Sequence, residues 1–237
     1  DLAEDRERFN SLMKELNVLQ PESAIAKSSD EALLKSKHLG FPIIVRPSYV
    51  LGGRAMEIVY SESELEKYLT EAVKASNERP VLMDRFLNDA KEVDVDAISD
   101  GSNVCICGIL EHIEEAGIHS GDSTMVLPPY SLSRQVINDI KEKTKDIGLK
   151  LKVKGFLNIQ YAIKDEKIFI IEVNPRASRT IPFISKAVGV PLAKMASRIM
   201  AGKSLEELSL PESFEIDHFC VKESVFPFIK FPNVDTI

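Results

Sequence analysis

The sequence is short of several residue types, and each shortage excludes a class of protein. It has no Trp and only 3 Cys in 237 residues, too few for a disulfide framework. Cys105 and Cys107 lack the C-x-x-C spacing of a redox or zinc pair. On a strand they would share one face, so we expect small core residues there. This cysteine usage fits a reducing compartment best.

Basic runs and long apolar runs are also missing. Lys plus Arg is 30 and Asp plus Glu is 37, giving a formal net charge of −7 without a Lys/Arg-rich segment, which argues against nucleic-acid binding. No apolar stretch of about 18 residues and no signal-peptide pattern occur, so we expect no membrane contact and a cytoplasmic address. The chain opens at Asp1 without Met and ends at Ile237, so we expect a piece of a longer protein.

The composition that remains is that of an ordinary globular protein. Hydrophobic residues make up 44% and charged residues 28%, and the length suffices for one large domain or two small ones. Apolar residues at the spacing i, i+3, i+4, i+7 predict a helix over residues 6–16. Ser28 with Glu31, and Ser61 with Glu64, are capping boxes that predict two further helix starts. Between them, residues 42–46 and 55–60 read as strands.

The rest of the chain predicts antiparallel hairpins. Residues 93–97 alternate apolar and acidic side chains, which indicates a half-buried strand, and Asp100-Gly101 indicates the turn after it. Residues 112–129 lack periodicity and read as a loop, and residues 133–149 read as a helix. Residues 156–163 and 168–174 form a second hairpin, and Pro182 and Pro191 begin two short helices. The predicted fold class is α+β, with a small helix–strand lobe followed by a larger lobe of antiparallel hairpins.

The most informative polar group lies at the end of the second hairpin. Glu172 and Asn174 point to one face of their strand, while Ile171 and Val173 are expected to point into the core. Gln160 should lie within about one residue of the position opposite Glu172. Three such oxygen donors suit Mg²⁺, which prefers a few protein ligands plus phosphate oxygens. Arg176 and Arg179 follow, completing a set suited to phosphoryl transfer, although an exposed polar strand end would look similar.

Three weaker groups accompany it. Arg46 ends a strand before Gly52-Gly53, where backbone N–H groups could approach a phosphate, although a plain hairpin turn has the same pattern. The loop 117–123 holds His119 but no Cys or second His, which makes it a poor zinc candidate. Glu92, Asp94 and Asp96 share a strand face that reads most simply as solvated.

Together these segments resemble an ATP-grasp domain, and specifically the large subunit of carbamoyl phosphate synthetase. The likeness rests on three strings: Arg-Pro-Ser-Tyr-Val-Leu-Gly-Gly-Arg-Ala-Met-Glu from Arg46, His-Ser-Gly-Asp-Ser from His119, and Glu-Val-Asn-Pro-Arg-Ala-Ser-Arg-Thr from Glu172. It covers nearly the whole chain. The Arg-Ala-Met continuation at residues 54–56 resembles the C-terminal half of that subunit, which phosphorylates carbamate.

The resemblance implies a role for each matching residue. The residues implied to contact ATP are Arg6, Arg46, Gly52, Gly53, Arg85, Leu87, Glu92, Gly117, Ile118, His119, Ser120, Gln160 and Glu172. Gln160, Glu172 and Asn174 match ligands of two Mg²⁺ or Mn²⁺ ions, and Arg176, Arg179 and Asn174 match the catalytic set around the transferred phosphoryl group. A K⁺ ion is implied near Glu92, His112, Glu114 and Ser123.

The same resemblance implies a domain plan and partners. Residues 1–20 would lead into the ATP-grasp unit, 21–85 would form its small lobe with the glycine loop, and 86–237 its large lobe with the metal and phosphoryl-transfer site. Carbamate and ATP would be the substrates, and the rest of the large subunit and a glutaminase small subunit the partners. Carbamoyl phosphate feeds arginine and pyrimidine biosynthesis.

Two alternatives stay open. The domain could be an ATP-binding module that is inactive outside its parent, or it could belong to another ATP-grasp ligase such as a biotin carboxylase or a purine-pathway enzyme. The strings Arg-Pro-Ser-Tyr and His-Ser-Gly-Asp-Ser disfavour the second alternative. A Rossmann dehydrogenase is excluded because no G-x-G-x-x-G fingerprint follows a strand.

Overall fold

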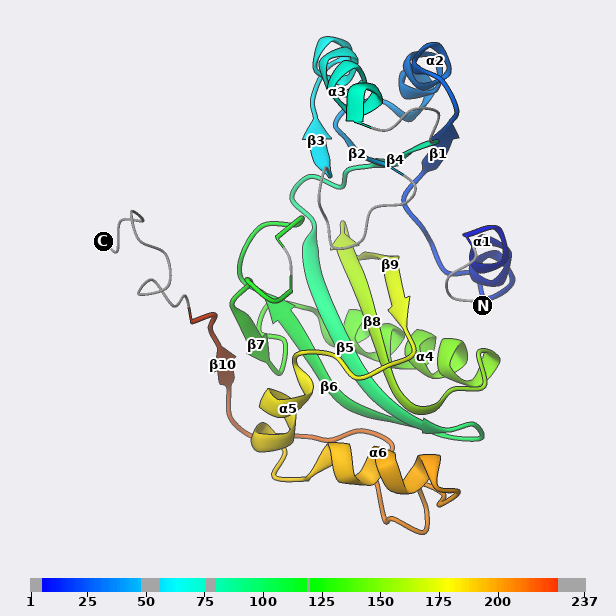
Figure 1. Cartoon of the computed structure of the whole chain (residues 1–237). Coiled ribbons are helices and arrows are strands. Elements are labelled where there is room, and N and C mark those ends of the chain that lie inside the picture. Colours follow the sequence, from blue (N-terminus) through cyan, green and yellow to red (C-terminus); the bar gives the residue numbers. More distant parts are fainter. Residues whose placement is uncertain (1–5, 48–55, 76–79, 119, 226–237) are drawn as a thin grey trace. The chain divides into compact units, whose positions relative to one another are not determined.

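The computed structural model describes residues 6–47, 56–75, 80–118 and 120–225 (Figure 1). The chain divides into two compact units, one of residues 19–89 and the other of residues 1–18 and 90–237. The two units are called the smaller and the larger unit below. Both combine helices with antiparallel sheets, as the predicted α+β class requires.

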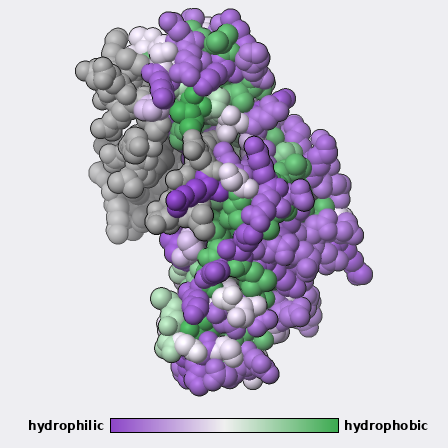
Figure 2. Space-filling model, turned by 90° about the vertical axis from the view of Figure 1, so that its right-hand side faces the viewer, coloured by the Kyte–Doolittle hydropathy of each residue, from purple (hydrophilic) through white to green (hydrophobic). Residues whose placement is uncertain are grey.

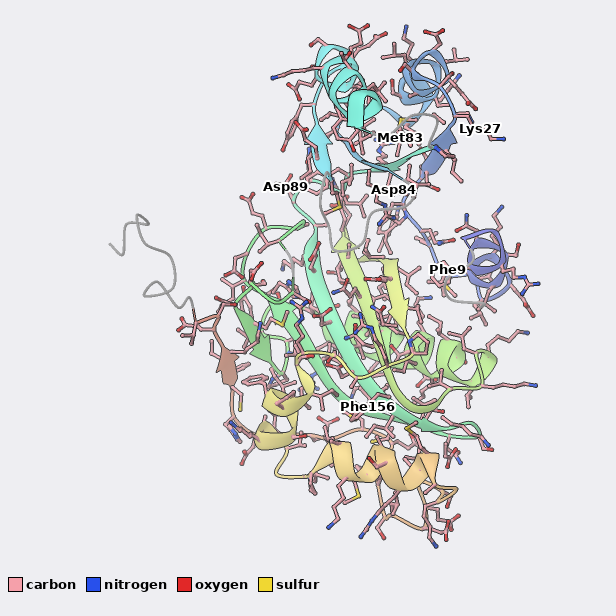
Figure 3. All side chains as sticks on the ribbon, in the orientation of Figure 1. Phe9, Lys27, Met83, Asp84, Asp89 and Phe156 are labelled. Carbon is pink, nitrogen blue, oxygen red and sulfur yellow. The ribbon has the colours of Figure 1, made fainter. Side chains whose placement is uncertain are left out.

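The smaller unit is a four-stranded antiparallel sheet with two helices. Its elements are β1 (Ser23–Ala26), α2 (Ser29–Leu39), β2 (Ile43–Pro47), β3 (Glu57–Val59), α3 (Glu62–Ala75) and β4 (Val81–Arg85). The strand order is β1-β4-β2-β3. Apolar residues of both helices, including Ala32 and Leu65, pack with the sheet residues Ile43, Val45 and Met83 in one core, where Figure 3 labels Met83.

Both predicted capping boxes of the smaller unit are present in a shifted form. The Ser28 hydroxyl accepts the Glu31 N–H at 3.2 Å, but the Glu31 carboxylate accepts the backbone N–H of Lys27 rather than that of Ser28. Glu64 likewise accepts from the residue before its cap, Tyr60, at 2.8 Å. Each glutamate thus satisfies a backbone donor one position outside the helix, which secures the entry of the chain.

The larger unit is built around a six-stranded antiparallel sheet. Its elements are α1 (Arg6–Glu15), β5 (Lys91–Asp100), β6 (Val104–His112), β7 (Met125–Leu127), α4 (Arg134–Lys150), β8 (Lys154–Lys164), β9 (Lys167–Asn174), α5 (Ile181–Ala187), α6 (Leu192–Met200) and β10 (Cys220–Lys222). The strand order is β10-β7-β6-β5-β8-β9 (Figure 1). The predicted hairpins β5–β6 and β8–β9 are confirmed.

Two separate cores cover the two faces of this sheet. Helices α1 and α4 pack on one face, through residues such as Met13 and Ile140, against Val95 and Tyr161. Helices α5 and α6 cover part of the other face, where Phe156, labelled in Figure 3, packs. Cys105 and Cys107 both lie in this second core, which confirms the prediction of small core residues on one face.

The structure corrects three sequence-based predictions. The predicted loop 112–129 contains strand β7, which pairs with the end of β6 and extends the sheet. The acidic face of β5 is not solvated, because Asp94 and Asp96 are only 2% and 1% exposed. Ile171 does not point into the core: its side chain is 45% exposed.

None of the described helices is long and apolar enough to cross a membrane. On the face shown in Figure 2, hydrophobic residues are interspersed among hydrophilic ones.

The core under α4 gives a direct test of the fold. Ile147 is fully buried on this helix, whereas Leu149, two residues further on, is 38% exposed. Replacing Ile147 by Ala should lower the free energy of unfolding by about 2–5 kcal/mol, because a buried cavity is left. The matched change Leu149→Ala should cost less than about 1 kcal/mol. Urea unfolding of the two variants measures this, and equal losses would contradict the assigned burial.

Candidate active site

Polar side chains form two rows across three neighbouring strands of the larger unit. They lie on the face that α5 and α6 cover elsewhere, because residues two apart on a strand share a face and Phe156 belongs to the core under those helices. In each row the strand partners lie directly opposite one another in the register. The first row is Asp94, Gln160 and Glu172, and the second row is Asp96, Asn158 and Asn174. The expected position of Gln160 opposite Glu172 is therefore confirmed.

A β-bulge explains how β9 keeps both Glu172 and Asn174 on this face. The register passes from the pair Gln160 and Glu172 to the pair Tyr161 and Ile170, which leaves Ile171 without a partner. The extra residue shifts the alternation by one position. Ile170 and Val173 can then both lie in the core, while Glu172 and Asn174 stay on the polar face. The exposed Ile171 is a consequence of this bulge.

In the second row, both carboxylate oxygens of Asp96 accept hydrogen bonds from within the protein. One of its carboxylate oxygens accepts from the Asn158 amide at 3.1 Å, and the other accepts from the Thr180 hydroxyl. Burial raises the pKa of Asp96 to about 6, although hydrogen bonds from Thr180 and Ser178 oppose this shift. Asp96 is therefore a structural anchor whose two oxygens are both engaged within the protein.

Three other side chains of the two rows differ from Asp96, because none of them makes a hydrogen bond to a described residue. They are Gln160, Glu172 and Asn174. Glu172 is exposed, and Gln160 and Asn174 are partly buried. Their amide and carboxylate oxygens are hard donors of the kind that Mg²⁺ prefers alongside phosphate oxygens. The residues present thus fit a divalent cation bound together with a phosphate group.

Two guanidinium groups follow the end of β9. The Arg176 N–H donates to the Asn174 carbonyl at 2.8 Å, and its guanidinium donates to the Ala177 carbonyl at 3.2 Å. Arg176 is exposed, and Arg179 lies three residues further along the turn. The turn begins at Asn174. The guanidinium groups of Arg176 and Arg179 therefore follow within a few residues of Asn174, whose side-chain oxygen has no hydrogen-bond partner among the described residues. A charged phosphoryl group suits such a combination.

Lys222 is a residue that sequence reasoning missed. From β10 its ammonium donates to the Ser120 carbonyl at 2.9 Å and to the Ser123 carbonyl at 3.0 Å. Burial lowers its pKa, and the positive charge of Arg179 acts in the same direction, while Asp94 opposes it. Lys222 therefore holds the loop that the resemblance assigns to the nucleotide. Its sequence neighbourhood offers no motif that could have revealed this.

A buried polar group lies next to the first row. His112 Nδ1 is 3.6 Å from a Glu92 oxygen, and His112 Nε2 is 3.6 Å from an Asp94 oxygen. His112 Nε2 and the other Asp94 oxygen, Oδ1, are buried and have no hydrogen-bond partner among the described residues. Glu92 also accepts the Gly117 N–H at 2.8 Å.

Glu114 and Ser123 are bonded to each other in the segment that follows β6. Glu114 accepts from the Ser123 hydroxyl and from the Thr124 N–H, both at 2.7 Å. Burial acts to raise the pKa of Glu114, but these hydrogen bonds outweigh it, so the pKa is lowered. In residues 6–47, 56–75, 80–118 and 120–225, no cluster of three or more His, Cys, Asp or Glu side chains is arranged to hold a metal ion.

The remaining candidate residues divide between the two units and the undescribed positions. In the smaller unit, Arg46 pairs with Asp84 at 3.3 Å and Arg85 lies 3.8 Å from Glu22. Leu87 is partly buried there. In the larger unit the backbone of Gly117 is fixed by Glu92, and Ile118 is 44% exposed. Gly52, Gly53 and His119 lie outside the described residues, as does the side chain of Arg6.

Comparison with solved structures defines the class of fold. The chain superposes on a biotin carboxylase from Campylobacter jejuni with a TM-score of 0.77 and 19% identity, covering 93% of this chain and 50% of that one. The biotin carboxylase domain of a 2-oxoglutarate carboxylase from Hydrogenobacter thermophilus gives a TM-score of 0.73 and 22% identity, with 93% and 49% covered. The protein therefore has the ATP-grasp fold.

Sequence comparison defines the family. The family described as the carbamoyl-phosphate synthase L chain, ATP binding domain, matches residues 5–208. The carbamoyl phosphate synthase large chain of Archaeoglobus fulgidus is 58% identical over 237 residues, which is all of this chain and 22% of that protein. The C-terminal section of this large chain in Aquifex aeolicus is 53% identical, and the match covers 47% of it. The chain belongs to this family and spans about a fifth of its full-length relatives.

The buried carboxyl of Asp96 predicts a pH-dependent stability. Its pKa of about 6 lies above the ordinary aspartate value of 3.8, so between these values the folded chain holds a proton that the unfolded chain has released. Stability therefore falls as pH rises through this window and levels off above it. Relative to Asp96→Asn, the free energy of unfolding of the original chain should drop by about 2 kcal/mol between pH 4 and pH 6.

Urea unfolding at a series of pH values measures this difference. Asp165→Asn, at an exposed aspartate of the β8–β9 turn, is the matched control and should give no comparable trend. A constant difference between Asp96→Asn and the original chain from pH 4 to pH 6 would show that the carboxyl of Asp96 is not perturbed.

Proposed function

We propose that this domain catalyses the ATP-dependent phosphorylation of carbamate to carbamoyl phosphate, as the C-terminal half of a carbamoyl phosphate synthase large chain. Membership of the family and the likeness to a relative named as a C-terminal section support the assignment. The observation that carries it is the open set of Gln160, Glu172 and Asn174, which leads directly into the turn with Arg176 and Arg179.

Gln160, Glu172 and Asn174 would hold two divalent metal ions, Mg²⁺ or Mn²⁺, since both metals accept hard oxygen ligands. When bound, the metal supplies positive charge to the phosphates of the nucleotide. The related biotin carboxylase domain from Hydrogenobacter thermophilus is a complex with MgADP and bicarbonate. Arg6, Arg46, Gly52, Gly53, Arg85, Leu87, Glu92, Gly117, Ile118, His119 and Ser120 keep the nucleotide-binding roles that the family resemblance implies.

The chain itself would contribute two positively charged side chains held in position beside the reacting groups. Arg176 and Arg179 would bind the phosphoryl oxygens and the carboxylate of carbamate, which guanidinium groups can grip with two hydrogen bonds. Their charges offset the negative charge that develops on the transferred group. An oxygen of carbamate would attack the γ-phosphorus of ATP, and ADP would leave as the bond from the γ-phosphorus to the bridging oxygen breaks. The attacking oxygen is already anionic, so no general base is needed.

A monovalent cation is proposed near Glu92, His112, Glu114 and Ser123. Two observations support this: His112 Nε2 and Asp94 Oδ1 are buried without a hydrogen-bond partner among the described residues. Such unpaired atoms are costly unless a water or an ion meets them. A K⁺ ion there would offset the negative charge of Glu92 and Asp94 on one side of the first row.

Within its parent, the domain would work with the rest of the large chain and with a glutaminase small subunit, in the cytoplasm. Carbamoyl phosphate would then serve arginine and pyrimidine synthesis. Because the chain covers only 22% of a full-length relative, we expect that it cannot carry out the overall synthesis from glutamine, bicarbonate and ATP.

The reverse partial reaction tests the proposal. With Mg²⁺, the chain should form ATP from ADP and carbamoyl phosphate, and Glu172→Ala should lower kcat by at least ~100-fold by removing the one carboxylate of the open set. Glu206→Ala, which truncates an exposed glutamate outside both rows, is the matched control and should leave the rate unchanged.

The possible failures separate the alternatives. If neither protein makes ATP but calorimetry still detects MgATP binding, the domain is a binding module without turnover. Equal activities of Glu172→Ala and Glu206→Ala would contradict the assigned role of Glu172.

A further inference from the structure

We propose that Asp96 and Thr180 form a positioning pair that fixes the turn carrying Arg176 and Arg179, so that both arginines face the open ligand set. The inference deepens the proposed function and rests on it. Both oxygens of Asp96 are engaged within the protein, so it contributes through the turn rather than by touching the phosphoryl group.

The geometry of Thr180 is the first support. Thr180 is 2% exposed and occupies the N-cap position of α5, yet its side chain makes no capping hydrogen bond. An N-cap threonine ordinarily uses its hydroxyl oxygen to accept a backbone N–H of the first helical turn. Here the hydroxyl instead donates its single proton to Asp96 on β5, across 84 residues of sequence. The side chain of Thr180 thus links the start of α5 to β5.

The turn is held at both ends by hydrogen bonds. At its start the Arg176 N–H donates to the Asn174 carbonyl at 2.8 Å. At its end the Ser178 hydroxyl accepts the Thr180 N–H at 3.2 Å and lies 2.6 Å from the Thr180 hydroxyl. Arg179 stands immediately before Thr180, and its side chain has no hydrogen bond to a described residue. The placement of Arg179 therefore depends on the anchor beside it.

The anchor is also tied to the open ligands. Asn158 donates to Asp96 at 3.1 Å and lies directly opposite Asn174 in the register of β8 and β9. The second row thus joins the anchor of the turn to one of the proposed metal ligands through a single cross-strand pair. A buried carboxylate is a costly way to hold a turn, because a charge has been removed from water.

Two substitutions at Thr180 separate positioning from folding. Thr180→Val keeps the shape and removes the hydroxyl, whereas Thr180→Ser keeps the hydroxyl and removes the methyl group. In the synthesis of ATP from ADP and carbamoyl phosphate, Thr180→Val should lower kcat/KM for carbamoyl phosphate by about 10–100-fold, since small displacements of reacting groups have such effects. The KM for ADP should stay within about twofold, and Thr180→Ser should stay near the original rate.

Amide hydrogen exchange gives a readout that does not need activity. The amides of residues 176–180 should exchange faster in Thr180→Val than in the original chain, while Thr180→Ser should match the original. If Thr180→Val does not fold, Thr180→Ala provides the same comparison, because it also removes the hydroxyl that donates to Asp96.

The two proposals fail in different ways. If the original chain makes no ATP, the proposed function fails, and the exchange rates alone then decide whether the anchor exists. Unchanged exchange and unchanged kinetics for carbamoyl phosphate in Thr180→Val would overturn the positioning role. A loss that affects ADP and carbamoyl phosphate equally would also overturn it, because it would indicate general damage to the fold.

Discussion

The pairing register of β8 with its two neighbours, β5 and β9, is the constraint on which the site depends. It places Asp94, Gln160 and Glu172 in one line and Asp96, Asn158 and Asn174 in the next. A slip by one residue would turn every side chain of a strand to the opposite face. The core residues on that opposite face, among them Ile159 and Tyr161, resist such a slip because they would have to leave the apolar interior. The apolar core thus fixes the polar site.

The same sheet face serves two purposes along its length. Under α5 and α6 it is apolar and holds Ile98 and Phe156. Beyond these helices it carries carboxylates that are nonetheless buried, which is costly unless they are hydrogen-bonded. Asp96 meets this requirement through Asn158 and Thr180. The polar rows are therefore partly interior structure, at Asp96 and Asn158, and partly accessible, at Gln160, Glu172 and Asn174.

The local pattern of apolar, polar and turn residues predicted most helices and strands. It predicted the relative positions of site residues only within the single hairpin formed by β8 and β9. The position of Gln160 opposite Glu172 follows from a tight turn between two strands, so the sequence alone could supply it. The bulge at Ile171 could not be foreseen, since it responds to the packing of Ile170 and Val173 in a core that other elements complete. The alternation of apolar and acidic residues along β5 predicted a solvated acidic face. This prediction was wrong because residues that cover the face, such as Thr180, lie far away in sequence. Lys222 and Thr180 could not be found from local pattern for the same reason, since their partners are about 100 and 84 residues distant.

Within the two rows, some polar side chains are paired and others are not. Asp96 and Asn158 are bonded to each other, whereas Gln160, Glu172 and Asn174 have no side-chain partner among the described residues. Groups whose hydrogen bonds are met inside the protein do not reorganise when a ligand arrives, while groups left open can exchange water for the ligand. Fixed dipoles and charges stabilise a transition state most effectively when they need not reorient during the reaction. The turn held by Asp96 and Thr180 would supply fixed groups, and the nearby oxygens of Gln160, Glu172 and Asn174 would supply groups that can exchange water for a ligand. In the proposed positioning role, the buried carboxyl of Asp96 would contribute to catalysis through the order that it imposes on the turn with the arginines.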